Sequence, residues 1–437
     1  MRSFTSESVL VDDRLDLSLA PALTPAGLVA SPHFFSGFAA FPQVVARGLG
    51  VLADITATRY FQFAPQALRD PVLTANGDRL RAECFSAENG VYARFDLLGA
   101  GFDGGDIGFG TTNVDIGVAL RQALSTVTRE HLLHVTVGSE GLTVSDPAAT
   151  AHERPVEMPD RWVRALGNAA AMQHAMVPVL TLDAAQARAF VASLPPATGK
   201  YQAGWVTMTP SGVKVAARRT GGAAFVPGLH RLSALKRVLT NLDGLTFYQE
   251  PGDGDAPPVL VEAGLLAARL SLGLTAQAWR GFSGEGALLP SLAGATVTDD
   301  ADLVRSLLVF QPVIDVAGIA KQAGIDPGRV EAGLAVLAVS GCVGWDAHDG
   351  AWFHRQLPED EQRVDKDNPR LEAARRLVSG VSPLGDGVWD VASGDTTYRV
   401  TRDASGETRC GCAWYLSHGT SRGPCKHILA VRLWEQR

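Results

Sequence analysis

The stretch 410-CGCAWYLSHGTSRGPCKHILAVRLWEQR-437 contains three of the five cysteines of the chain. Its spacing is Cys410-x-Cys412, then twelve residues, then Cys425-x-His427. Zinc takes four ligands in a tetrahedron, and thiolates and imidazoles supply them at about 2.0–2.3 Å. The stretch therefore predicts a zinc site, formed by two pairs of ligands that the loop between them brings together.

The residues around the two pairs predict the local fold. Cys410 and Cys412 follow a strand pattern and are expected at the end of a hairpin, with Gly411 allowing a tight turn around the metal. Pro424 suits the first position of a helix that continues through "CKHILAVRLW". The positive end of that helix favours a thiolate at Cys425.

Other roles for these side chains have weaker support. A redox pair prefers Cys-x-x-Cys, and a catalytic thiol does not need three companions. His418, in the loop between the two pairs, competes as a ligand, although the set of four is complete without it. Cys84 and Cys342 stand apart from the cluster, and both are expected to be small buried hydrophobic residues.

The arrangement resembles the SWIM zinc finger, whose pattern is Cys-x-Cys, a variable gap, and Cys-x-His. The strand ending in "YRVTR" and the helix "PCKHILAVRL" match the ββα layout of that family, so the resemblance covers about residues 384–437. It implies one structural Zn²⁺, with no open position for water or substrate. By that resemblance the zinc ligands are Cys410, Cys412, Cys425 and His427.

SWIM modules are thought to bind DNA or proteins. Bacterial SWIM proteins of this general size resemble companions of MoxR-type AAA+ ATPases and of von Willebrand A-domain proteins. The resemblance therefore implies a protein that docks macromolecular partners, and it makes one of these two classes the candidate protein partner.

The composition is that of a soluble globular protein, with 46% hydrophobic and 19% charged residues among 437. No apolar run approaches the roughly 18 residues needed to cross a bilayer, and "MRSFTSESVLVDDRLDLSL" lacks the basic start of a signal peptide. We therefore expect a cytoplasmic protein without a membrane partner, in a compartment where disulfides rarely persist. The net charge of −7 argues against a wholly basic nucleic-acid binder.

The sequence predicts an α+β multidomain fold. Residues 1–30 are expected to form a weakly structured arm, and residues 31–294 an α+β region with hairpins at Asn89-Gly90, Glu140-Gly141 and Ser211-Gly212. Helical patterns, "DIGVALRQALSTV" and "TLDAAQARAFVASL", precede the second and third hairpins. These units are either a duplicated helix–hairpin module or the generic units of α+β domains.

Residues 299–358 predict a different unit. Three helical patterns, two of them with N-caps at Asp315 and Asp326, are followed by two short strands around an Asp-Gly turn. That order resembles a winged helix. Residues 359–383 are predicted to be a charged linker and a helix, which lead into the zinc finger at residues 384–437.

No catalytic constellation stands out. The sequence has no G-x-x-x-x-G-K-[ST] phosphate loop, no H-E-x-x-H and no G-x-S-x-G elbow, so we expect no enzymatic activity and no hydrolysis of ATP. Asp103 and Asp106, in "FDGGDIGFG", lack the ligand spacing of a calcium loop and are expected in a solvated turn. An enzyme with an unrecognised site in the first 294 residues is the third and least favoured hypothesis.

One segment is basic although the chain is acidic. Residues 200–249 hold seven basic residues and one acidic residue, Asp243. These basic side chains either contact nucleic acid or another anionic partner, or are ordinary solvated charges. The candidate contacts are Lys214, Arg218, Arg219, Arg231, Lys236 and Arg237.

The winged-helix-like unit has the opposite balance. Residues 301–357 contain four basic and six acidic residues, and two of the acids, Asp346 and Asp349, fall in the predicted wing, where DNA phosphate would be repelled. The sequence therefore favours a non-catalytic zinc-binding adaptor or scaffold, which docks partners through its finger and winged helix. The alternative is a DNA-binding accessory protein that uses residues 200–249 and the finger.

Overall fold

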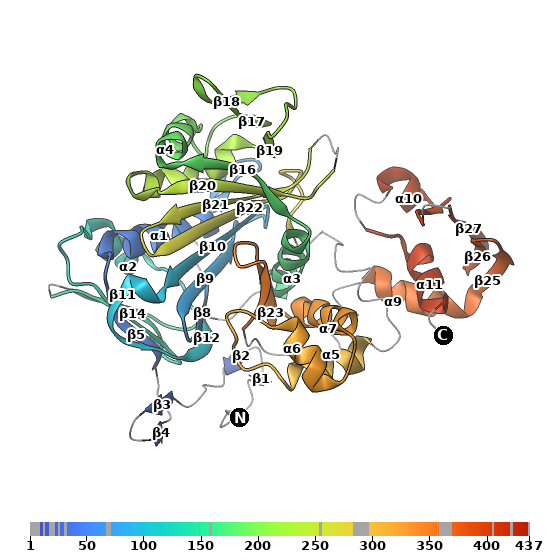
Figure 1. Ribbon diagram of the computed structural model, residues 1–437, viewed down its shortest axis with the longest axis horizontal. Helices are drawn as coiled ribbons and strands as arrows, with labels where there is room; N and C mark the ends of the chain where they lie inside the picture. The colour runs from blue at the N-terminus through green and yellow to red at the C-terminus, as the bar shows by residue number, and fades with distance from the viewer. Residues whose placement is uncertain are drawn as a thin grey trace.

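The computed structural model describes residues 9–11, 14–16, 22–24, 27–29, 33–66, 71–147, 149–156, 160–252, 256–282, 297–355, 357, 369–403, 406–419 and 423–435. They form a mixed α+β protein of several domains, as the sequence predicts (Figure 1). None of the described helices is long and apolar enough to cross a membrane.

An antiparallel sheet of eight strands forms the centre of the large α+β region. Its strand order is β12-β8-β9-β10-β22-β21-β20-β16, so that β10 and β22, which are far apart in the sequence, pair at its middle. The strands are β8 (Val72–Asn76), β9 (Arg79–Phe85), β10 (Val91–Leu98), β12 (Phe109–Asn113), β16 (Val177–Asp183), β20 (Gly244–Gln249), β21 (Val259–Leu265) and β22 (Ala268–Leu274).

Helices cover one face of this sheet. Helix α1 (Pro42–Thr56) is apolar over most of its surface and packs on β9 and β10. The 3₁₀ helix η2 (Leu229–Asn241) packs on α1 and on α4 (Ala184–Ser193), and α2 (Val118–Thr126) packs on α1. The sequence predicts a helix over "LHRLSALKRVL", and the structure forms it as a 3₁₀ helix rather than an α-helix. A capping box between Asp183 and Gln186 begins α4.

The three predicted hairpins are confirmed. They are β9–β10, β13–β14 and β17–β18, and the last two follow α2 and α4 as expected. At Gly141 and Gly212 φ is +111° and +110°, a conformation that glycine adopts at little cost. The duplication of a helix–hairpin module stays a prediction.

Two smaller sheets complete the large region. One has the order β11-β5-β13-β14-β15 and the other β18-β17-β19. Asp103 and Asp106 are exposed, as expected, but they lie in strand β11, paired with β5, and not in a turn. The strands are β5 (His33–Ala39), β11 (Phe102–Ile107), β13 (His134–Gly138), β14 (Gly141–Ser145), β15 (Thr150–Glu153), β17 (Gly204–Thr209), β18 (Gly212–Ala216) and β19 (Ala224–Val226).

Short elements lie at the edges of this region. Within the predicted N-terminal arm, residues 1–30, the structure describes two strand pairs, and the other residues of the arm lie outside the described ranges. These elements are β1 (Val9–Val11), β2 (Arg14–Asp16), β3 (Ala22–Thr24), β4 (Gly27–Val29), β6 (Thr58–Arg59), β7 (Ala64–Pro65) and η1 (Gly99–Gly101). The longer helix α3 (Asp160–His174) instead packs on α7 (Pro327–Val339) and β23 (Val343–Asp346) of the unit that follows.

Three helices and a hairpin follow, in the predicted order. The side chain of Asp315 accepts the backbone N–H of Gly318 at 3.0 Å, and that of Asp326 accepts the N–H of Gly328 at 2.7 Å, so both predicted N-caps are confirmed. The name winged helix stays a prediction. The elements are α5 (Val297–Arg305), α6 (Val316–Ala323), α7 (Pro327–Val339), β23 (Val343–Asp346) and β24 (Ala351–His354).

The β23–β24 hairpin docks on the second face of the large sheet. Alternation along β9 and β10 places Arg81 and Arg94 on that face, where Asp346 accepts from them at 2.7 and 2.9 Å. Arg269 of β22 lies at 3.2 Å from the same carboxylate. Asp346 is fully buried, and the expectation that this wing residue would face and repel phosphate is wrong.

The C-terminal segment has more structure than its pattern indicates. Two strands and a helix are expected, whereas a four-stranded sheet and two helices are present. Residues 358–368, which include most of the predicted linker, lie outside the described residues, and the expected helix is α9. The elements are α9 (Pro369–Leu377), η5 (Val378–Gly380), β25 (Val381–Gly385), β26 (Val388–Ser393), β27 (Thr396–Arg402), β28 (Thr408–Cys410), α10 (Ala413–His418) and α11 (Lys426–Glu435).

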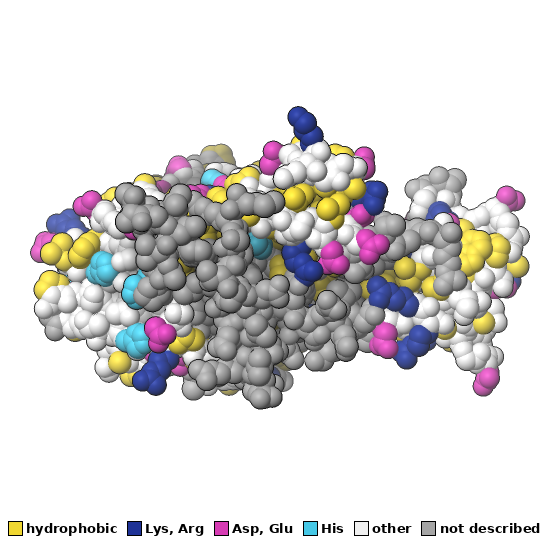
Figure 2. All heavy atoms as spheres, turned by 90° about the horizontal axis from the view of Figure 1, so that it is seen from below, with side chains coloured by type: hydrophobic (Ala, Val, Ile, Leu, Met, Phe, Trp, Pro, Cys, Tyr) yellow, Lys and Arg dark blue, Asp and Glu magenta, His cyan; other side chains and the backbone are white. Residues whose placement is uncertain are grey.

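The C-terminal module, residues 369–435, stands at one end of the molecule (Figure 1). Buried hydrophobic residues of the three-helix unit and of this module form one cluster, separate from the core under the large sheet. Viewed from below, acidic, basic and apolar side chains intermingle over the described surface (Figure 2).

Candidate metal centre

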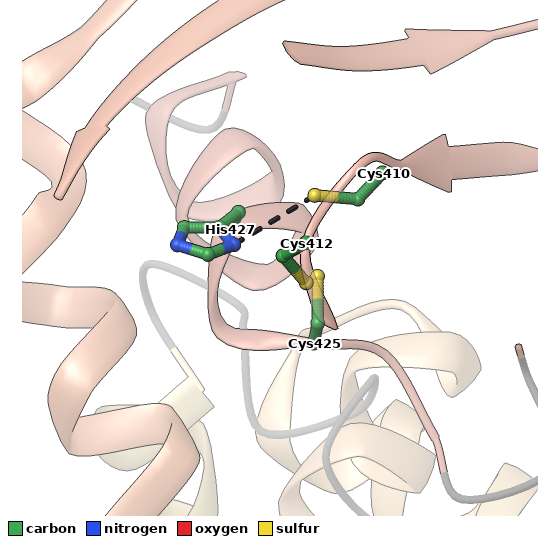
Figure 3. Close-up of side chains that lie close together, drawn as sticks. All are labelled: Cys410, Cys412, Cys425 and His427. Carbon is green, nitrogen blue, oxygen red and sulfur yellow. Dashed lines mark hydrogen bonds between the residues drawn. The ribbon is translucent and has the colours of Figure 1, made fainter. Parts of the chain in front are cut away.

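The four predicted ligands come from three elements that meet at one point (Figure 3). Cys410 is the last residue of β28, and Cys412 is the N-cap of α10. Cys425 immediately precedes α11, whose first turn holds His427. The sequence reaches this geometry locally because a strand end, a one-residue spacer and a helix start all direct side chains inward.

The distances fit a tetrahedral ion. The candidate ligand atoms of all four residues lie within 4.8 Å of one another, and Cys410 Sγ is 3.7 Å from His427 Nδ1. Ligands at zinc–sulfur distances of about 2.3 Å stand about 3.8 Å apart along a tetrahedral edge. The cluster is thus close to the size that one zinc ion requires.

The centre is closed to solvent. The exposed fractions are 5% for Cys410, 4% for Cys412, 1% for Cys425 and 2% for His427. Four protein ligands fill a tetrahedron, and a buried site of that kind leaves no position for water or substrate. The arrangement is suited to a structural ion rather than to a catalytic one.

The thiols interact strongly with one another. A hydrogen bond from the Cys410 thiol lowers the pKa of Cys425 to about 4, and the same bond raises the pKa of Cys410. The backbone N–H of Tyr415 donates to Cys412 Sγ at 3.4 Å. Three ionised thiolates this close repel one another unless a cation lies between them, so the donor set fits a soft divalent metal.

Neighbouring side chains hold the ligands in place. The ring of Tyr398, from β27, stacks on the ring of His427 with 4.3 Å between centroids. Arg402 pairs with Glu435 at 2.6 and 2.9 Å and so joins β27 to the end of α11. Arg370 of α9 donates to the carbonyl of Pro424 at 3.1 Å, just before the second ligand pair.

The remaining cysteines and His418 lie outside the cluster. Cys84 and Cys342 are buried, as predicted for small hydrophobic residues. His418 packs its ring against Trp414, with centroids 4.6 Å apart, at the end of α10. It is not one of the four residues whose ligand atoms converge.

The structure does not bring the six basic candidates together. Arg231 is fully buried and donates to the carbonyls of Pro227 and Thr275 at 2.9 and 2.8 Å and to that of Gly90. Burial lowers the pKa of Arg231 to about 10. Arg231 therefore links three backbone segments through hydrogen bonds, and the expectation that it contacts phosphate is wrong.

The other five candidates lie in two places. Lys214 and Arg218 are exposed on and just after β18, and Arg219 lies 5.3 Å from the ring centre of Trp205 and donates to the carbonyl of Gly252. Lys236 and Arg237 belong to η2 and line a cavity together with Arg47 of α1 and Arg121 of α2. Sequence reasoning missed Arg47 and Arg121, because each stands alone in its own helix with no local signal.

No family model matches the chain, and no curated protein matches it. Among solved structures, Proliferating Cellular Nuclear Antigen from Entamoeba histolytica is 12% identical, with a TM-score of 0.36, over 56% of this chain and 98% of that one. The PCNA2–PCNA3 complex from Sulfolobus tokodaii is 9% identical, with a TM-score of 0.39, over 55% and 98%. TM-scores this low do not establish a shared fold, so neither similarity identifies a function.

Proposed function

We propose that this protein is a non-catalytic, zinc-binding adaptor that docks macromolecular partners. The observation that carries the proposal is the closed Cys3His cluster, in which every candidate ligand is at least 95% buried. A site of this kind stabilises a small fold, and for zinc-finger peptides the apparent binding free energy is about 10–16 kcal/mol. One Zn²⁺ would therefore hold the C-terminal module together and keep its outer surface in shape.

The module has features suited to a partner. Leu384 in β25 and Leu416 in α10 are 55% and 76% exposed, and both lie in the metal-dependent fold rather than in the large core. Large exposed apolar side chains on a rigid support are typical anchors of protein interfaces. A docking role in the module would depend on the metal, although the metal itself would touch no partner.

The rest of the molecule would act as a support. The three-helix unit is fixed to the large sheet by buried ion pairs, which suits a scaffold better than a mobile DNA reader. By the SWIM resemblance, we propose a MoxR-type AAA+ ATPase or a von Willebrand A-domain protein as the partner. The alternative, a DNA-binding protein that uses residues 200–249, loses support because Arg231 is buried and the other candidate contacts lie in two separate places.

The proposal is tested by metal content and partner binding in matched variants. We expect the purified protein to contain one zinc per chain, and Cys410→Ser to lose it. Cys342→Ala, which removes a buried thiol outside the cluster, should keep it. Zinc retained by Cys410→Ser, or absent from the wild type, contradicts the assignment of the metal centre.

Partner binding is measured with the purified MoxR-type ATPase and von Willebrand A-domain protein of the same organism. The wild type and Cys342→Ala should bind one of them, and Cys410→Ser should bind it at least tenfold more weakly, because the docking surface loses its fold. A Leu416→Asp variant that keeps its zinc tests the surface separately. Equal binding by all four proteins would count against docking through the module.

A further inference from the structure

A groove runs between the helices that cover the large sheet. One cavity of about 670 Å³ lies among α1, α2 and η2, and a second of about 420 Å³ lies beside the end of α1. The two share Arg121 and Lys236 in their walls, so they lie next to each other. Two adjoining cavities that span three helices suit an extended ligand better than a compact one.

The walls of the groove are positive. Arg47, Arg121, Lys236 and Arg237 line it, and Asp54 is the single acidic residue in the lining. These residues come from three helices that lie up to 190 positions apart in the sequence. In a chain with a net charge of −7, such a local excess of basic side chains points to an anionic ligand.

The basic side chains are held in place by contacts that leave positive charge available. Arg237 donates two hydrogen bonds to Asp54, at 2.6 and 2.9 Å, and Arg121 lies 3.6 Å from the same carboxylate. Arg47 donates to the neutral oxygens of Thr240 and Asn241 at 2.5 and 2.6 Å. Within the described residues, Arg47 and Lys236 form no ion pair.

One exposed aromatic ring lines the second cavity, and two more lie nearby in the chain or in contact with each other. Phe63 lines it and is 42% exposed. Two residues earlier in the chain, Phe61 is 38% exposed and lies beside Trp279, which is 64% exposed, with 6.3 Å between ring centroids. Exposed aromatic rings next to a basic groove are what a single strand of nucleic acid needs, because its bases stack on rings while its phosphates follow the charges.

We propose that this groove binds single-stranded nucleic acid. Arg47, Lys236 and the Arg121–Arg237 pair would contact successive phosphates, and Phe63 would stack with a base. A concave groove of this size suits one strand, whereas a duplex is convex and offers its bases only within its grooves. An acidic peptide would use the charges equally well, but it would leave the aromatic rings without a role.

The inference is independent of the metal centre. The basic groove residues stand on α1, α2 and η2, whose buried side chains belong to the large core, whereas the three zinc-ligand cysteines belong to the second hydrophobic cluster. Cys410→Ser should therefore bind single-stranded DNA as the wild type does. Failure of the groove and failure of the zinc adaptor are thus separate results.

The test is a salt titration of binding to labelled oligothymidylate by the full-length protein. For a single strand, the slope of log affinity against log salt is about −0.7 for each phosphate contact. Arg47→Gln with Lys236→Gln should therefore flatten the slope by about 1.4. Lys236→Gln alone replaces an exposed side chain that makes no ion pair within the described residues, and it should flatten the slope by about 0.7.

Two further variants make the test specific. Lys214→Gln with Arg218→Gln removes two exposed charges away from the groove and should leave the slope unchanged. Phe63→Ala should weaken binding roughly fivefold or more at every salt concentration without changing the slope, because stacking releases no counterions.

Several outcomes would overturn the proposal. One is no binding of oligothymidylate at low salt. The others are a salt slope flattened as much in the Lys214/Arg218 control as in the groove variants, or an unchanged salt slope in Lys236→Gln. Tighter binding of duplex DNA than of the single strand would refute the preference for one strand. Equal, groove-dependent binding of polyglutamate would show instead that the groove receives an acidic protein segment.

Discussion

Asp346 is a buried carboxylate that joins two parts of the molecule. Burial alone would raise the pKa of Asp346, but Arg94, Arg81 and Arg269 outweigh it and hold that pKa far below its usual range. Asp96 lies in the same cluster and accepts from Arg81 at 2.6 Å and from Arg94 at 2.8 Å. A carboxylate so placed is satisfied only if the hairpin and the sheet stay together.

We predict that Asp346→Asn lowers the free energy of unfolding by about 3–5 kcal/mol, because it leaves buried arginines without their partner. Urea denaturation measures the change. Asp349→Asn is the matched control, because Asp349 contacts Arg79 and Arg269 at the edge of the cluster and keeps a side-chain exposure of 19%. A loss no larger than that of the control would contradict the role given to Asp346.

His348 provides a pH-dependent contact at the tip of the same hairpin. Its Nδ1 lies 2.7 Å from a carboxylate oxygen of Glu262, and this hydrogen bond raises the pKa of His348. Because the pKa of His348 is higher in the folded state, the contact stabilises the fold fully only below the unfolded pKa of about 6.5. The effect is lost as the pH rises through the folded pKa.

An NMR titration of the His348 ring should therefore give a pKa above about 6.5. In Glu262→Gln, which keeps the shape of the side chain and removes its charge, that pKa should fall. The opposite result, an unchanged His348 pKa in Glu262→Gln, would mean that another group sets it.

At the scale of elements, the C-terminal module shows how the metal and the fold depend on each other. Strand β28 is three residues long and α10 has six, too short to persist without tertiary support. They are joined to α11 through the four ligands, and β27, the neighbour of β28, is joined to α11 through Arg402–Glu435. Loss of the metal should therefore release these elements first.

Hydrogen exchange after treatment with a chelator tests this directly. Amide protection should fall in β28 and α11, while β9, β10, β21 and β22 keep theirs, because those strands belong to the other hydrophobic core. Cys410→Ser should reproduce the pattern without chelator, and Cys342→Ala should not. Uniform loss of protection along the chain would show that the two cores unfold as one.

On the scale of the whole molecule, local signals predicted elements well. The Asn89-Gly90, Glu140-Gly141 and Ser211-Gly212 turns and the N-caps Asp315 and Asp326 are formed as expected. The second ligand pair and its helix are likewise neighbours in the sequence. These features are predictable because the residues that make them lie within a few positions of one another.

Features made by distant residues were predicted poorly. Neither Arg81 of β9 nor Arg94 of β10 was singled out from the sequence, and on an isolated sheet both side chains would face water. Only the docked hairpin buries them, and there their charges pair with Asp346 instead of facing water. The same holds for Arg231, whose basic neighbours suggested a surface and whose surroundings are backbone carbonyls.

The sequence by itself thus determined the mixed α+β class, the turns, the caps and the convergence of the four metal ligands, because each depends on short-range spacing. The tertiary structure alone decided which charges are buried and which share a groove. Arg47, Arg121 and Lys236 meet only because α1, α2 and η2 pack on one another above the sheet. A charge pattern along a chain does not record which side chains face each other, since that depends on the packing of elements far apart in sequence.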